Sequence, residues 1–123
     1  MQQYAYPPAT LRQAIVRLVQ RDDTDLSTLQ LAVLLISTEE DGPHTVRGLA
    51  ARLNVAKPAI SRAVDRLEQY GLTQRMEDTR DRRSVLIVST GVGTAFVADL
   101  AAMPATAANG CGQSVTALAA AAG

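Results

Sequence analysis

The sequence contains very little cysteine, histidine or aromatic side chain. Its 123 residues include one cysteine, one histidine, three tyrosines, one phenylalanine and no tryptophan. One cysteine cannot form a disulfide within a single chain or a cysteine-based zinc site, which excludes both. With so few rings, stacking on the bases of single-stranded nucleic acid is a poor fit.

The sequence also shows no pattern typical of a signal peptide or a membrane span. The first ten residues have neither a basic region nor an apolar stretch of the kind that begins a signal peptide. No apolar run approaches the roughly 20 residues of a membrane span. We therefore expect a cytoplasmic protein that has no membrane partner.

Charge is balanced overall but unevenly distributed. Twelve basic residues match twelve acidic ones, and 47% of the residues are hydrophobic, enough for a buried core. Residues 44–83, the basic segment, hold nine basic and five acidic residues, a net charge of +4, and the remainder holds three and seven, a net charge of −4. This asymmetry predicts one face that binds a polyanion.

The spacing of apolar residues predicts four helices within residues 9–70. They cover residues 9–21, about 28–40, 46–53 and 58–70. Ser27 and Thr45 are suited to cap the second and third helices. Pro58 suits the first turn of the fourth helix, which buries Ile60, Val64 and Leu67.

Side chains then alternate with a period of two residues, which predicts a β-hairpin. Its strands cover 72–77 and 84–89, and its charged tip covers 78–83. Thr90 is suited to cap a last helix from about residue 91. Pro104 and the Asn109–Gly112 cluster predict loop or disorder over 104–112, followed by a weak Ala-rich helix over 113–122. These elements divide the chain into three segments: residues 1–25, 26–90 and 91–123.

Helix, tight corner, helix and charged hairpin, in this order, predict a winged helix-turn-helix: a mainly α fold with a small β-hairpin wing and flanking N- and C-terminal helices. The outer face of helix 58–70 fits a major groove about 12 Å wide, and the arginine-rich tip suits phosphates or a minor groove. The candidate DNA-contacting residues are Lys57, Pro58, Ala59, Ser61, Arg62, Arg66, Arg80, Arg82 and Arg83. Three carboxylates are expected to brace the wing by pairing with arginines: Asp65, Asp78 and Asp81.

These segments resemble the MarR (multiple antibiotic resistance regulator) family of transcription regulators. The resemblance covers about residues 26–97 and is carried by Leu49-Ala50 with Leu53, residues 61–68, Gly71-Leu72, Arg75, residues 78–85, Thr90 and Gly93. It implies a homodimer on a pseudo-palindromic operator, usually a repressor, often released by a small-molecule inducer or by thiol oxidation. The implied organisation is an N-terminal arm and dimerisation helix (1–25), a winged helix-turn-helix DNA-binding domain (26–90), and a C-terminal helix with an Ala-rich tail that forms an atypical dimerisation region (91–123). By family position, Arg62 and residues 58–61 would read the major groove, and Arg83 would reach the minor groove or brace the wing.

Two features depart from the family pattern. Ser89 stands where the family usually has leucine, and the C-terminal region is short, Ala-rich and interrupted by Pro104. The predicted dimer therefore rests mainly on helix 9–21 and the helix that carries Phe96, or is weak or unusual in construction.

The remaining candidates favour plain interpretations. Cys111 is expected to be an inert thiol, His44 a loop residue, and Tyr4 and Tyr6 part of a frayed terminus. Ser61 has no histidine partner, and no glycine-rich loop stands between a strand and a helix, so we do not expect an enzyme or a cofactor. One histidine is too few ligands for a metal site, so we expect no metal. Two alternatives remain open: a winged helix that docks an acidic protein, and a protein that has lost dimerisation and antagonises a related regulator.

Overall fold

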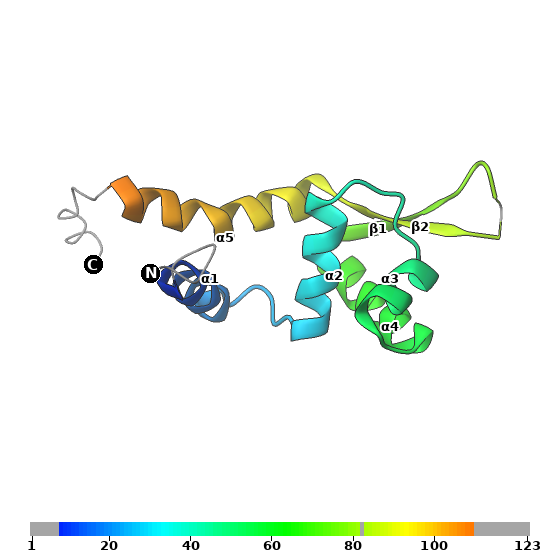
Figure 1. The fold of residues 1–123 in the computed structure, drawn as a ribbon, viewed down its shortest axis with the longest axis horizontal. Helices are drawn as coiled ribbons and strands as arrows, with labels where there is room; N and C mark the ends of the chain where they lie inside the picture. Colours follow the sequence, from blue (N-terminus) through cyan, green and yellow to red (C-terminus); the bar gives the residue numbers. More distant parts are fainter. Residues whose placement is uncertain (1–7, 82, 110–123) are drawn as a thin grey trace, which may run out of the picture. The chain divides into compact units, whose positions relative to one another are not determined.

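The computed structural model describes residues 8–81 and 83–109 and consists there of five helices and one two-stranded hairpin (Figure 1). This confirms the predicted mainly α fold with a small β-hairpin wing. The elements are α1 (Pro8–Gln20), α2 (Thr28–Glu39), α3 (Val46–Leu53), α4 (Lys57–Gln69), β1 (Thr73–Glu77), β2 (Val85–Ser89) and α5 (Gly91–Asn109).

The chain divides into two compact units. One unit, Leu26–Val97, contains α2, α3, α4, the hairpin and the first turns of α5. The other combines Met1–Asp25 with Ala98–Gly123 and contains α1 and the rest of α5. The segment roles expected for 1–25, 26–90 and 91–123 stay predictions.

Helix α2 lies at the centre of the Leu26–Val97 unit. Its Val33 and Leu34 are completely buried, as are Ile60, Val64 and Leu67 on the inner face of α4, as predicted. Ser27 caps α2 in a capping box with Gln30, and the Thr45 side chain accepts a hydrogen bond from the Gly48 backbone at the start of α3. These caps fix where both helices begin, because they satisfy amides that lack a partner within the helix.

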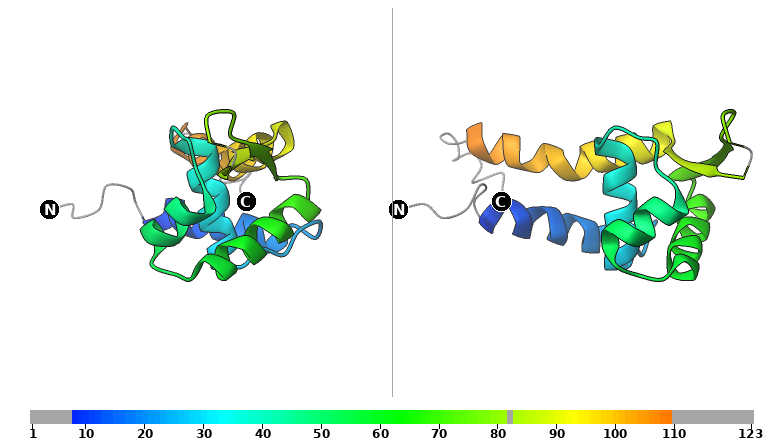
Figure 2. Two further views of the ribbon diagram at one scale, coloured as in Figure 1. Left: turned by 90° about the vertical axis from the view of Figure 1, so that its right-hand side faces the viewer. Right: turned by 45° about the vertical axis from the view of Figure 1, so that its right-hand side comes forward.

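The hairpin is antiparallel and pairs Thr73 with Ser89, Arg75 with Ile87, and Glu77 with Val85. The segment before α3 docks on β2, since the Ile87 amide donates to the His44 carbonyl at 2.8 Å. The right-hand view in Figure 2 shows the hairpin and α4 at the same end of this unit.

A tight junction joins the end of α4 to the start of α5. The Thr90 hydroxyl donates to the Gly71 carbonyl at 2.6 Å and accepts from the Gly93 amide at 3.0 Å. A Cβ atom on Gly93 would lie 2.1 Å from the Leu72 carbonyl oxygen, so only glycine fits there. Thr90 caps α5, as the sequence predicts.

Helix α5 continues through Pro104 to Asn109, so the loop predicted from residue 104 is wrong as far as residue 109. Alanine has the highest helix propensity, and five alanines flank Pro104 between residues 101 and 108. That prediction gave more weight to one proline, which removes a single backbone donor, than to the composition around it. The predicted loop over 110–112 and helix over 113–122 lie outside the described residues.

Helix α1 contacts α5 through its polar side. Arg17 lies 2.8 Å and Arg21 3.1 Å from the Asp99 carboxylate, and Arg21 also binds Asp23. The hydrogen bond from Arg21 holds the pKa of Asp23 below its usual value, and the same bond raises the pKa of Arg21 itself. The apolar side chains at positions 11, 15 and 19, the α1 stripe, remain exposed.

We predict that Gly93→Ala destabilises the protein by roughly 1–3 kcal/mol, because the added methyl group collides with the Leu72 backbone. The matched control is Gly91→Ala in the same helix, where a Cβ meets nothing within 4 Å. Urea unfolding of both variants at one protein concentration measures the difference. Equal midpoints for the two variants would show that the junction tolerates a side chain.

Candidate nucleic-acid interface

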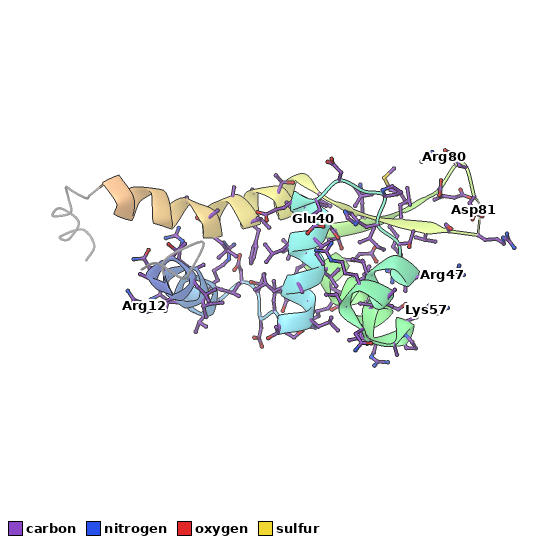
Figure 3. The ribbon with its side chains drawn as sticks, in the orientation of Figure 1. Arg12, Glu40, Arg47, Lys57, Arg80 and Asp81 are labelled. Carbon is purple, nitrogen blue, oxygen red and sulfur yellow. The ribbon has the colours of Figure 1, made fainter. Side chains whose placement is uncertain are left out.

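A groove of about 750 Å³ lies between the beginnings of α3 and α4 and the wing. Three basic side chains and one acidic side chain line it: Arg47, Lys57, Arg83 and Asp81. Figure 3 shows Arg47 and Lys57 on the same side of the unit as the wing tip. The groove therefore brings together charges from three segments that are distant in sequence.

The outer face of α4 carries most of the predicted major-groove residues. Pro58, Arg62 and Arg66 are exposed, and Ala59 and Ser61 are half-buried. The N-cap residue, Ala56, supplies no side-chain hydrogen bond, so the first turn of α4 presents backbone amides without a side-chain cap. Such a helix start favours an anion.

The arginines of α4 differ in what holds them. The Arg66 guanidinium lies 5.1 Å from the centre of the Tyr70 ring and donates to Gln69 at 3.2 Å. Arg62 makes no ion pair or side-chain hydrogen bond with any described residue. Arg62 is thus available to a ligand, whereas Arg66 already has partners.

Carboxylates shape the wing tip through the backbone. Asp78 accepts a hydrogen bond from the Arg80 amide at 2.9 Å, and Asp81 accepts one from the Arg83 amide at 3.1 Å. The Arg83 guanidinium is 3.8 Å from Asp81, and its side chain is 94% exposed. The Arg80 side chain is exposed as well, and Arg82 lies outside the described residues. The backbone of the tip is thus held by these carboxylates, while the side chains of Arg80 and Arg83 extend into solvent.

Arg75 connects the wing to α4. Its guanidinium lies 2.8 Å from Asp65, pairs with Glu68 and donates to the Ser61 carbonyl at 3.3 Å. Its backbone amide donates to Glu68 at 2.9 Å. Asp65 therefore has an arginine partner on the hairpin, and its bracing role stays a prediction.

Sequence reasoning did not select Arg47 or Arg75 as site residues. Arg47 stands in the first turn of α3, a helix to which the sequence assigned only packing. Its position in the basic segment, just after a cap, was the available signal. Arg75 had a weaker signal, because only the tertiary fold shows which carboxylates it meets.

Arg52 lies outside the groove because it forms a bidentate pair with Glu40 at the end of α2. Hydrogen bonding from Arg52 holds the pKa of Glu40 below its usual value, with a smaller contribution from His44, and Glu40 raises the pKa of Arg52. This pair joins α2 to α3.

Other kinds of site have little support in the part of the chain that is described. There, no helix is long and apolar enough to cross a membrane, and no group of three potential metal ligands comes together. His44 is a loop residue, and its ring contacts the Glu40 carbonyl at 2.9 Å. Cys111, Tyr4 and Tyr6 lie outside the described residues.

Solved structures of several transcriptional regulators are similar to this chain. BldR from Sulfolobus solfataricus is 28% identical, with a TM-score of 0.60, over 92% of this chain and 81% of that one. A MarR-family regulator from Rhodococcus sp. RHA1 is 27% identical, with a TM-score of 0.58, over 89% of this chain and 74% of that one. A mutant form of ZitR from Lactococcus lactis is 21% identical, with a TM-score of 0.58, over 72% of this chain and 60% of that one, and shows the fold alone.

A comparison with curated protein sequences finds no match. The family model described as MarR family matches residues 26–85, which include α2, α3, α4, β1 and the wing tip. This segment contains the groove and all its lining residues. Over residues 26–85 the chain is similar to the MarR family of transcriptional regulators.

Proposed function

We propose that this protein is a homodimeric regulator that binds a specific double-stranded DNA operator and acts as a repressor. The observation that carries the proposal is the groove that Arg47, Lys57 and Arg83 line between two helix starts and the wing. Cations held together in this way attract a phosphodiester backbone and replace the counterions that DNA releases on binding.

In this proposal α4 enters the major groove and the wing follows the adjacent minor groove. Arg62 is exposed and unpaired among the described residues, so its two terminal nitrogens can bind both acceptors of a guanine. Arg83 extends from the wing with little intramolecular restraint. Phosphate contacts from the groove supply affinity, and α4 with the wing supplies sequence preference.

The dimer is proposed from the α1 stripe. Leu11 is 67% exposed and Val19 is 76% exposed, with Ile15 between them on the same face. Arg17 of α1 and Arg21, just after its end, are directed at Asp99, while the α1 stripe stays exposed. A second copy of the chain is the occupant that removes this surface from water and gives the two-fold symmetry of an operator.

Cytoplasmic location, repression as the output and release by a small-molecule inducer are proposed from the family resemblance. Repression requires an operator that overlaps a promoter. The described side chains do not specify the chemical identity of an inducer.

We predict that a random pool of DNA duplexes, selected at two salt concentrations, yields an inverted repeat with half-sites roughly 34–36 Å apart. Weak binding that vanishes at higher salt, with no enriched sequence, would overturn the operator proposal. That outcome would favour docking of an acidic protein.

We expect Arg62→Ala to weaken binding to the selected duplex by about 1–3 kcal/mol and to relax one base preference per half-site. The matched control is Arg66→Ala on the same helix, which we expect to cost less because Tyr70 and Gln69 hold this side chain. Equal losses on the selected and a scrambled duplex would contradict base reading by Arg62.

Arg47→Ala and Arg83→Ala test the phosphate contacts of the groove. Each should weaken binding to selected and scrambled duplexes alike and reduce the slope of log affinity against log salt by about one. Arg52→Ala is the control, since Arg52 is paired with Glu40 outside the groove. An unchanged slope for Arg83→Ala would assign it to wing bracing or a base contact instead.

Val19→Asp should convert the dimer into a species of the 13.0 kDa monomer mass, because a carboxylate cannot be buried unpaired in an apolar seam. Gln20→Asp places the same charge on an exposed position of α1 outside the stripe and should leave the dimer intact. Light scattering after gel filtration measures both masses. A wild-type protein that is already monomeric would overturn the dimer and favour the antagonist alternative.

A further inference from the structure

Asp65 occupies an unfavourable place for a DNA-binding surface. It lies on the exposed face of α4 between Arg62 and Arg66, and its side chain is 60% exposed. A carboxylate there would repel phosphates. It would also attract Arg62, because side chains three residues apart on a helix are neighbours.

The structure shows a different pairing. The Asp65 carboxylate is held at 2.8 Å by Arg75 of β1, and Arg62 has no partner among the described residues. Asp65 is the sole acidic residue three or four positions from Arg62 along α4. An arginine on another element therefore holds the one carboxylate on this helix that could capture Arg62.

We propose that Arg75 is a positioning residue: by holding Asp65, it neutralises that carboxylate and leaves Arg62 free to contact DNA. This inference rests on the proposed function. Glu68 allows Arg75 to do this, because it binds both the guanidinium and the backbone amide of Arg75 and so fixes the strand beside α4. Arg75 is half-buried and acts through Asp65 and Arg62.

The free protein gives a test that needs no DNA. Phenylglyoxal modifies accessible guanidinium groups, and mass spectrometry measures the rate at Arg62, with Arg47 as the internal standard. We expect Arg75→Gln to slow modification of Arg62 about twofold, the effect of one exposed helical ion pair. Adding Asp65→Asn should restore the wild-type rate. An unchanged rate at Arg62 in Arg75→Gln would overturn the capture by Asp65.

DNA binding gives the second test, with the duplex selected by the wild-type protein as the probe. Arg75→Gln should weaken binding about tenfold, since it unmasks a negative charge beside phosphates. The double variant Asp65→Asn/Arg75→Gln should recover most of the loss. Its matched control, Glu68→Gln/Arg75→Gln, has the same net charge and should not recover.

The outcomes separate the possible roles. Equal recovery in both double variants would reduce the effect to net charge, and recovery in neither would make Arg75 purely structural; each result overturns the proposal. Urea unfolding of every variant identifies losses caused by instability. If the wild-type protein selects no duplex, the proposed function fails, and the modification rate of Arg62 still decides whether Arg75 controls its pairing.

Discussion

The attachment of the hairpin to α4 is the constraint on which the rest of the candidate interface depends. A hairpin of two five-residue strands has no core of its own and is marginally stable alone. Here it is anchored along β1 by the contact between Arg75 and Glu68, and at its base by Thr90, which binds Gly71 just after α4. Because both anchors are at α4, the wing and the outer face of the helix keep one relative position. Elements fixed in this way can meet two grooves of one duplex at once.

The same contacts organise charge. The basic segment contains five carboxylates, and four of them bind groups of the hairpin. Glu68 and Asp65 bind Arg75, while Asp78 and Asp81 bind the backbone amides of Arg80 and Arg83. Each of these carboxylates thereby has a partner within the hairpin or α4, and the guanidinium groups of Arg62 and Arg83 remain in solvent. The net charge of zero conceals this arrangement, because it is the pairing pattern, not the total, that decides where a polyanion meets unpaired cations.

How much the sequence could predict follows from the range of each interaction. The helices, their caps and the buried face of α4 depend on neighbours within four residues, so Ser27, Thr45 and Ile60 are predictable. The contacts of Arg75 depend on a strand folding back beside a helix, and the groove at Arg47 depends on three segments meeting; no local pattern encodes either. The error at Pro104 has a different origin. The prediction weighed one helix-breaking proline above the alanines around it, but the summed helix propensity of the segment favours a helix.

In the unit that contains α1, ion pairs also determine which surface is available for a dimer. A helix usually buries its apolar side and exposes its charges. Here Arg17 of α1 and Arg21, just after the helix, bind Asp99, and the α1 stripe is left exposed. Those ion pairs are partly exposed, so each contributes little to stability. Their effect is orientation: by fixing which side of α1 faces α5, they determine which side is presented outward. If a second copy covers that stripe, weak surface ion pairs set the geometry of an interface whose stability comes from apolar burial.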